Sequence, residues 1–208
     1  MFYFTKTPFW LKKLYPSCLW NYPNSAGAKN IYLSFDDGPH AAATPFVLDE
    51  LKKYNAKASF FCIGKNVLEE TSIYKRILIE GHRVGNHSFN HLNGWKTDSA
   101  VYLDNIEKAR RLIDSNLFRP PYGRASAFQI RNLRQKLGYQ IVMWDVLSGD
   151  FDPAVGGRQA AENVISKSRS GSIVVFHDST KAFPVLKEAL PLVLAYFSSE
   201  GYSFKTIE

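Results

Sequence analysis

Short apolar runs alternate along the chain with longer stretches in which apolar residues recur at helical spacing. The runs predict strands at residues 31–35, 58–63, 82–87, 139–145, 172–178 and 202–207. The longer stretches predict helices at about residues 44–54, 67–80, 98–114, 125–137, 159–168 and 184–199. Strands that alternate with helices in this way form parallel βα units. Because polar residues stand at the ends of several strands, we expect an α/β fold with a single-domain (β/α) barrel, an irregular seven-stranded (β/α)7 barrel.

Turn-forming residues mark the boundaries of these elements. Thr44 and Pro45 have the residue types preferred at the N-cap and at the first position of a helix. Gly81 and Gly138 follow the apolar repeats of two helices and suit the left-handed conformation after a helix end. The two prolines of FRPPYG cannot continue a helix, so a rigid loop is expected at residues 118–123.

The first 20 residues are aromatic and basic, but Lys6, Pro8, Lys12, Lys13 and Pro16 interrupt their apolar stretches. A signal peptide needs an unbroken apolar segment and a transmembrane helix needs about 20 apolar residues, so neither is predicted. We expect residues 1–30 to be an extension packed on a domain of residues 31–208. Contact of its aromatic and lysine side chains with a membrane surface is the alternative. A cytoplasmic location is the default expectation, with association with the cell envelope left open.

Composition narrows the classes of partner. The chain has 208 residues, a formal net charge of +7 and a sequence pI near 9.3. Its basic residues are spread over predicted helix faces and form no basic arm or recognised nucleic-acid motif. A nucleic-acid partner is therefore not expected, whereas an anionic cell-wall polymer suits the charge. Cys18 and Cys62 are too few for a disulfide framework, and Cys62 is expected to be a buried thiol in a strand.

Two groups of polar residues follow the first and third predicted strands. Asp36 and Asp37 precede a Gly-Pro pair, and a turn of this kind is by itself most often structural. His87 and His91 are four residues apart in HSFNH, so a helical turn would place both imidazoles on one face. With Asp37 they offer three ligands of the types that bind Zn²⁺ and leave a fourth position open, as in catalytic zinc sites. We expect a site for Zn²⁺, or for another divalent transition metal such as Co²⁺ or Ni²⁺.

Candidates for further chemistry lie in three other segments. Arg119 stands in the rigid RPPYG loop, where its guanidinium can pair with a carboxylate; a surface arginine is the alternative. His177 ends the apolar run SIVVFHD and is a candidate acid or base, because its ordinary pKa is near neutral. A structural histidine is the alternative there. Asp145 and Asp150, in MWDVLSGDF, are both placed to orient such a histidine.

The segments LSFDDGP, HSFNH, RPPYG, MWDVLSGDF and VVFHD match, in this order, the motifs of a known family. The chain resembles the polysaccharide deacetylases of carbohydrate esterase family 4, also called the NodB homology domain, from roughly residue 31 to the C-terminus. The resemblance implies a metal-dependent hydrolase acting on carbon–nitrogen bonds of linear amides. Its substrates would be N-acetylglucosamine-containing polysaccharides such as peptidoglycan, chitin or chitooligosaccharide, and Asp37, His87 and His91 would bind the metal.

The same resemblance implies a role in catalysis for five further residues. Asp36 would be the general base, and Arg119 would orient it. His177 would be the general acid, oriented by Asp150. The backbone N–H of Tyr122 would help to hold the oxyanion.

Three positions depart from the common pattern of the family. Phe151 stands where Trp is common, Leu147 where Asp is frequent, and Val175 where Leu is common. The resemblance places Pro121, Tyr122, Phe151 and Val175 around the substrate. These changes are therefore expected to alter substrate preference more than activity.

Two other functions stay open. One is an O-acetyl esterase acting on acetylated xylan, because the same catalytic groups cleave esters. The other is a carbohydrate-binding protein with a decayed site, which the complete set of expected metal ligands disfavours. His40 and His82 receive no role.

Overall fold

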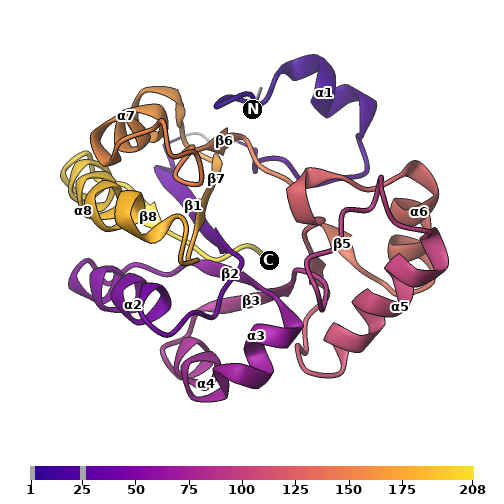
Figure 1. Cartoon of the computed structure of the whole chain (residues 1–208). Coiled ribbons are helices and arrows are strands. Elements are labelled where there is room, and N and C mark those ends of the chain that lie inside the picture. Colours follow the sequence, from indigo (N-terminus) through magenta and orange to yellow (C-terminus); the bar gives the residue numbers. More distant parts are fainter. Residues whose placement is uncertain (1–2, 24–26) are drawn as a thin grey trace.

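The computed structural model describes residues 3–23 and 27–208 (Figure 1). Its strands are β1 (Asn30–Asp36), β2 (Ser59–Cys62), β3 (Arg83–Asn86), β4 (Leu117–Phe118), β5 (Gln140–Ile141), β6 (Val146–Leu147), β7 (Ile173–His177) and β8 (Ser203–Phe204). Its helices are α1 (Phe9–Leu14), α2 (Ala43–Lys53), α3 (Gly64–Glu69), α4 (Thr71–Ile79), α5 (Ser99–Arg110), α6 (Ala127–Gln135), α7 (Gly157–Lys167) and α8 (Phe183–Ser199). A single 3₁₀ turn, η1 (Pro121–Gly123), occupies the predicted rigid loop.

The strands form one parallel sheet in the order β5-β4-β3-β2-β1-β7-β6, and β8 pairs in parallel with the start of β1. The sheet curls, and the helices surround it (Figure 1). This arrangement confirms the predicted irregular (β/α) barrel. Within the described residues β5 and β6, at the two ends of this order, do not pair, so the barrel is open along one side.

Side chains of β1 alternate between two environments, as expected for a strand. Leu33 and Phe35 belong to the largest apolar cluster, between the sheet and the outer helices, whereas Ser34 and Asp36 lie on the inner face. The interior of the barrel holds a much smaller apolar cluster, formed by Phe61, Leu117, Val142, Ile173 and Ile207. Polar side chains occupy the end of the barrel at which the parallel strands finish.

The N-terminal segment, residues 3–22, lies along the open side of the barrel (Figure 1). The N–H of Leu19 donates to the carbonyl of Ile141 at 2.8 Å, and the N–H of Met143 donates to the carbonyl of Leu19 at 2.7 Å. The N–H of Leu147 donates to the carbonyl of Thr5 at 2.9 Å. The segment thus hydrogen-bonds the chain on both sides of the gap between β5 and β6.

Side chains also fix this segment to the body. Cys18 and Trp20 are buried in an apolar cluster with residues of α5 and α6. Lys6 and Lys12 each lie 2.6 Å from a carboxylate oxygen of buried Asp145. A domain boundary at residue 30 stays a prediction, and residues 1–2 and 24–26 of the expected extension lie outside the described residues. Among the helices that are described, none is long and apolar enough to cross a bilayer.

Three predicted elements differ in the structure. The helix predicted at residues 67–80 is broken at Glu70 into α3 and α4, because Glu70 has φ −119° and ψ 45°. The N-cap assigned to Thr44 is wrong: α2 begins one residue earlier, and the Thr44 hydroxyl instead contacts Asp178 at 2.5 Å. The strand predicted at residues 139–145 is confined to β5, since Arg119 takes the carbonyls of Val142 and Met143 that a ladder would use.

Candidate active site

Asp36 is the last residue of β1, and its Cα is paired with that of His177 on β7. The chain then turns through Asp37, whose φ is 78°. The N–H of the next residue, Gly38, donates to Asp178 Oδ1 at 3.0 Å. A Cβ on Gly38 would lie 2.1 Å from Asp178 Oδ2, so only glycine fits this turn. The adjacent carboxylates of Asp36 and Asp37 therefore point to different partners.

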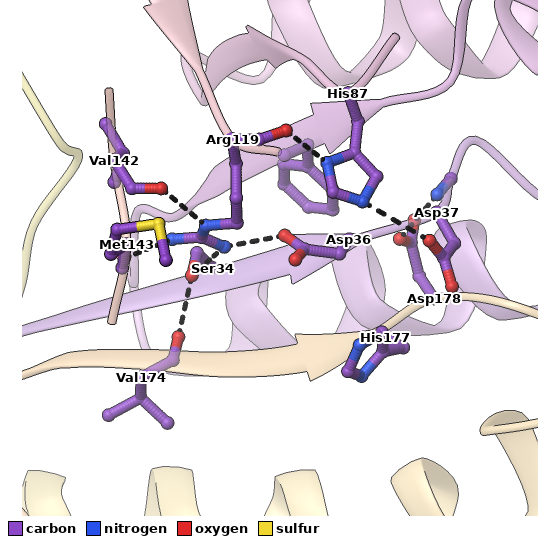
Figure 2. Close-up of polar contacts among 12 residues, drawn as sticks. Ser34, Asp36, Asp37, His87, Arg119, Val142, Met143, Val174, His177 and Asp178 are labelled. Atoms are coloured by element: carbon purple, nitrogen blue, oxygen red, sulfur yellow. Dashed lines mark hydrogen bonds and ion pairs between the residues drawn. The ribbon is translucent and has the colours of Figure 1, made fainter. Parts of the chain in front are cut away.

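Arg119 holds the Asp36 carboxylate from inside the barrel (Figure 2). Its Nη1 lies 2.6 Å from Asp36 Oδ1 and 2.8 Å from Ser34 Oγ. Its Nε and Nη2 donate to the carbonyls of Val142 and Met143, at 3.3 and 3.1 Å. With its donors directed to four groups, the buried guanidinium has one orientation, and Asp36 is fixed with it.

The ring of Phe61 supports this arginine from one face. The Arg119 guanidinium carbon lies 4.0 Å from the ring centroid, within cation–π range. The ring has room there because Gly85 of β3 has no side chain; a Cβ on Gly85 would lie 2.5 Å from two ring atoms. Burial of Arg119 therefore depends on a glycine in the neighbouring strand.

Asp37, His87 and His91 bring one potential ligand atom each to within 4.8 Å of one another. Asp37 Oδ1 lies 3.1 Å from His91 Nε2 and 3.6 Å from His87 Nε2. His87 Nδ1 donates to the carbonyl of Arg119 at 2.8 Å, which leaves Nε2 free to bind an ion. Burial lowers the pKa of His87 to about 4, so its ring is neutral, as a ligand must be.

The buried Asp37 oxygen is a second indication of an ion. Among the described residues, no hydrogen bond of good geometry satisfies Asp37 Oδ1. Burial raises the pKa of Asp37, but the close contact with His91 and the charge of His177 outweigh burial and hold it below its ordinary value. A half-buried carboxylate whose inner oxygen faces two imidazole nitrogens suits a divalent cation.

The two histidines converge through a loop, so the helical turn expected between them is wrong. Ser88 and His91 have φ of 64° and 56°, which no α-helix contains. The rings still approach, with centroids 5.1 Å apart. The backbone, instead of helical periodicity, brings His87 and His91 to the same point.

Two asparagines shape this loop, and neither was predicted from the sequence. Asn86 Oδ1 accepts the N–H of Ser88 at 2.8 Å. Asn105 Oδ1, from α5, accepts the N–H groups of Phe89 and Asn90 at 2.9 and 3.0 Å. The one signal for Asn105 was a polar residue on the buried face of a helix.

Asp150 orients His177 through two contacts. Asp150 Oδ1 lies 2.8 Å from His177 Nδ1, and Oδ2 accepts the backbone N–H of His177 at 2.7 Å. Burial opposes the charged imidazole, but the charge and hydrogen bond of Asp150 outweigh it and raise the pKa of His177 to about 9. Asp145, the other expected partner, does not contact His177: its N–H bonds the carbonyl of Ile173, at the opposite end of β7.

The residues expected around the substrate lie at different depths. The ring of Tyr122, 54% exposed, packs 4.6 Å from the ring of His91, and Phe151 packs 5.2 Å from His177. Tyr122 has a φ of 61°, which directs the rigid loop toward His91. Pro121 is buried. Val175, 1% exposed, faces the same side of β7 as His177 and can only form a floor.

Hydrogen bonds with the backbone account for His40 and His82, so neither needs a catalytic role. His40 Nδ1 accepts the N–H groups of Ala42 and Ala43 at 3.2 and 3.1 Å, at the start of α2. His82 Nδ1 accepts the N–H of Ala58 at 3.2 Å, and burial lowers the pKa of His82 to about 4. Both imidazoles accept hydrogen bonds from backbone N–H groups.

Asp178 is a further residue whose importance the sequence did not reveal. Its two oxygens accept from Gly38 N–H and from the Thr44 hydroxyl, and burial raises its pKa to about 8. It ties the end of β7 to the turn that carries Asp37. The only sequence signal was its position next to His177 in VVFHD.

A polar hollow of about 400 Å³ adjoins the three converging side chains. Asp37 and His91 form one of its walls. Residues of the loop after β1, of the α3–α4 region and of the loop after β7 form the rest: the polar His40, Asn66, Glu69, Glu70, Ser179 and Thr180 and the apolar Pro39, Ala41 and Ile63. Such a lining offers many hydrogen-bonding partners to a hydroxyl-rich ligand.

Comparison with known proteins points in one direction. A family model described as "Polysaccharide deacetylase" matches residues 24–142. A peptidoglycan-N-acetylglucosamine deacetylase of Bacillus cereus is 34% identical over 194 residues, covering 90% of this chain and 90% of that protein. The Listeria monocytogenes enzyme PgdA, of the same description, is 33% identical over 89% of this chain, which spans only 40% of that protein's length.

Solved structures agree in fold. The Bc1960 peptidoglycan N-acetylglucosamine deacetylase, crystallised with an aryl hydroxamate, has a TM-score of 0.86 and 31% identity, with 97% of this chain and 95% of that chain covered. BA3943 of Bacillus anthracis, described as a pseudoenzyme of carbohydrate esterase family 4, has a TM-score of 0.80 and 25% identity over 95% of this chain and 69% of its own. The fold is therefore shared by active and inactive proteins, and activity has to be argued from the site.

Proposed function

The chain belongs to the polysaccharide deacetylase family, and from that premise we propose that it hydrolyses N-acetyl groups of an N-acetylglucosamine-containing polysaccharide, with the aid of a divalent metal ion. We favour peptidoglycan as the polymer, because the relatives from Bacillus cereus and Listeria monocytogenes are named for that substrate. A net charge of +7 suits an anionic cell-wall polymer. A relative from Azorhizobium caulinodans is named a chitooligosaccharide deacetylase, which makes chitooligosaccharide the second candidate.

One observation carries the proposal. The carboxylate of Asp36 is held by buried Arg119. The next residue, Asp37, belongs to a separate cluster of three potential metal ligands. A hydrolase that uses a metal needs both a ligand set and a base that is not a ligand. The adjacent aspartates supply one of each.

Asp37, His87 and His91 would hold the ion, and Zn²⁺ suits a set of one carboxylate and two neutral imidazoles. The unsatisfied Asp37 oxygen and the free Nε2 of His87 fit this assignment. The bound ion would supply positive charge that favours attack on the acetyl carbonyl. Co²⁺ and Ni²⁺ remain candidates, because imidazole also suits other transition metals.

The protein's own groups would move the protons. Asp36, fixed by Arg119, would accept a proton from the attacking water as the new carbon–oxygen bond forms. The N–H of Tyr122 would donate to the developing oxyanion. His177, oriented by Asp150, would give its proton to the sugar nitrogen as the carbon–nitrogen bond breaks. The products are acetate and a free amino sugar.

The two alternatives receive less support. An O-acetyl esterase would use the same groups but would need the acid less, whereas Asp150 is arranged to keep His177 protonated. A decayed carbohydrate-binding protein would be expected to lose one of the ligands or the base, whereas Asp36, Asp37, His87 and His91 are all present and correctly grouped. An active N-deacetylase is the better reading of this geometry.

Acetate release tests the function directly. The metal-depleted protein and the protein reloaded with Zn²⁺ would be assayed on peptidoglycan, chitooligosaccharides and acetylxylan. We expect metal-dependent release from the first two substrates and slower release from acetylxylan. Release from acetylxylan alone would replace the proposal with the esterase, and no release from any substrate, with Zn²⁺ bound, would replace it with the binding protein.

A further inference from the structure

A second pocket, mostly apolar and of about 350 Å³, shares no lining residue with the polar hollow. One wall comes from the N-terminal segment and the other from the barrel, with Tyr3, Thr7 and Leu11 on the first and Tyr122, Trp144 and Leu147 on the second. The segment that bridges β5 and β6 therefore also encloses a cavity. Ligand pockets commonly have volumes of about 300–1,000 Å³ and mostly apolar linings, so this cavity is large enough to bind.

Ring contacts at both ends connect the pocket to the reacting groups. Tyr122 lines the pocket, and its ring contacts that of His91 at 4.6 Å. At the other end the ring of Tyr3 packs 5.0 Å from Phe151, which packs 5.2 Å from His177. Two lining residues therefore contact groups of the site, Tyr122 directly at an expected metal ligand and Tyr3 through Phe151 at the expected acid.

The floor between these ends is apolar as well. Leu147 lines the pocket, and its Cα is paired with that of Val175, two residues before His177. The family commonly has a carboxylate at the position of Leu147. In this chain an apolar side chain stands at that position instead.

Three of the polar groups on the lining are already used by the protein. The Thr7 hydroxyl donates to the carbonyl of Trp144 at 2.8 Å. The indole N–H groups of Trp20 and Trp95 donate to the carbonyls of Tyr15 and Ala125, at 3.1 and 3.2 Å. A sugar ring placed against these three groups would lose water from its hydroxyls without gaining partners from them, which is unfavourable. The Arg124 guanidinium, also of a lining residue, lies over the Trp95 ring, 5.2 Å from its centroid. An alkyl or aryl group would lose nothing.

We propose that this pocket receives the acyl side of the substrate and accepts N-acyl groups longer than acetyl. The inference rests on the proposed function, because it assigns a specificity to the same site. A methyl group is close in size to a water molecule, which occupies about 30 Å³ in the liquid, so acetyl alone would leave most of the pocket empty. Hydrolysis breaks the same carbon–nitrogen bond, and the longer carboxylate leaves in place of acetate.

Hydroxamates of different chain length test this directly, because their two oxygens bind Zn²⁺ and their alkyl chain extends to the acyl side. Affinities of acetohydroxamate and hexanohydroxamate for the Zn²⁺-loaded full-length protein would be measured by calorimetry. Each buried methylene is worth about 0.8 kcal/mol, or about fourfold in affinity. Hexanohydroxamate has four more methylenes, so complete burial would give about 200-fold, and burial of only two of them would give roughly tenfold. We expect hexanohydroxamate to bind at least about tenfold more tightly than acetohydroxamate.

Substitutions in α1 test whether the longer alkyl chain enters this pocket. Leu11→Trp and, separately, Leu14→Trp fill the pocket from the N-terminal wall and should reduce the gain to about threefold or less. Phe9→Trp is the matched control, since Phe9 is on the same helix but 71% exposed and does not line the pocket. Thermal melting of each variant shows whether it is folded.

Each other outcome overturns the inference. Equal affinity for both hydroxamates, or a full gain kept in folded Leu11→Trp and Leu14→Trp, means that the chain does not enter this pocket. If those variants weaken chitotriose binding without changing the chain-length gain, the pocket is a sugar subsite. If acetohydroxamate and hexanohydroxamate both fail to bind, the metal site itself is wrong and the proposed function fails with the inference. Acetate release with no gain in affinity would leave the function intact and overturn the pocket alone.

Discussion

Asp36 and His177 form the last Cα pair of the ladder between β1 and β7. Their neighbours have opposite charges: Arg119 lies against Asp36, and Asp150 lies against His177. A nearby cation favours a carboxylate that can accept a proton, and a nearby anion favours an imidazolium that can donate one. Two adjacent strands therefore present a base and an acid side by side, an arrangement expected of acid–base catalysis.

Replacing Asp36 should separate catalysis from metal binding. Asp36→Asn keeps the shape of the side chain but cannot accept a proton, so activity on a chitooligosaccharide should fall by about 10²–10⁴-fold. Zn²⁺ affinity, measured by calorimetry, should stay close to that of the wild type. Asp49→Asn, at an exposed aspartate, is the control. Near wild-type turnover, or loss of the metal, would show that Asp36 is not a separate base.

Removing His87 should have the reverse effect. His87→Ala deletes one of three ligands, so Zn²⁺ affinity should fall by at least about tenfold to a hundredfold, and activity should fall with it. His82→Ala removes another buried histidine that is not a ligand, and it controls for loss of packing. Metal content after dialysis gives the answer. Unchanged stoichiometry and affinity in His87→Ala would show that the ligand set is wrong.

The buried Asp145 should stabilise the protein by holding the N-terminal segment. Its oxygens contact Lys6 and Lys12 at 2.6 Å and the Ser172 hydroxyl at 2.5 Å. Burial raises the pKa of Asp145, but hydrogen bonds from these three residues outweigh burial and lower it. Burial of Lys6 lowers its pKa even though Asp145 raises it, so desolvation offsets part of the ion pair. We expect Asp145→Asn to lose about 1–3 kcal/mol at pH 7, because both lysines keep some access to water.

The sign of the pH effect follows from the lowered pKa. Stability from Asp145 is present above its unfolded pKa, near 4, and is lost as pH falls through the lower folded pKa. Urea unfolding of wild type and Asp145→Asn should therefore differ most near pH 7 and converge toward pH 2–3. Lys13→Ala is the control. Lys13 is a lysine of the same segment, but it packs over the Phe9 ring, whereas Lys6 and Lys12 contact Asp145. A difference that grows in acid would contradict this account.

The sequence predicted those candidate site residues that stand directly at the end of a strand. Asp36 and His177 each end an apolar run, so a barrel places them at the same rim. It did not predict groups that act from a distance along the chain. Asn105 lies 15 residues beyond Asn90 on a separate helix and shapes the loop only after α5 has packed. Periodicity reports which residues face a core, and such pairings are decided by tertiary structure.

The same limit explains the error at β5. An apolar run from residue 139 predicts a long strand, yet the carbonyls of Val142 and Met143 serve the buried Arg119. The neighbouring N–H of Met143 bonds to Leu19 of the N-terminal segment. Neither partner can be recognised from the local pattern, because each is brought to this strand only by closure of the barrel.

His177→Ala should affect amide cleavage more than ester cleavage. An amine leaves only when its nitrogen is protonated, whereas an activated alkoxide or aryloxide leaves without that help. The variant should therefore lose about 10²–10⁴-fold in kcat/KM on a chitooligosaccharide and much less on an aryl acetate. Equal losses on both substrates, with Zn²⁺ still bound, would mean that His177 acts on the oxyanion or on the fold instead.

Replacing Asp150 should move the alkaline limit of activity. Burial disfavours the charge on His177, but the charge and hydrogen bond of Asp150 raise its pKa to about 9, so kcat/KM on an N-acetyl substrate should hold up to that region and fall above it. Asp150→Asn removes the negative charge, so the alkaline limb should move to lower pH, by about 1–3 units for a charge in contact. The pH profile of kcat/KM, at fixed free Zn²⁺, reports this value for the free enzyme. Asp152→Asn, at a half-buried aspartate two residues on whose Oδ1 accepts the N–H of Ala154, should leave the limb in place. An alkaline limb that stays fixed in Asp150→Asn would assign it to another group and remove His177 from the role of acid.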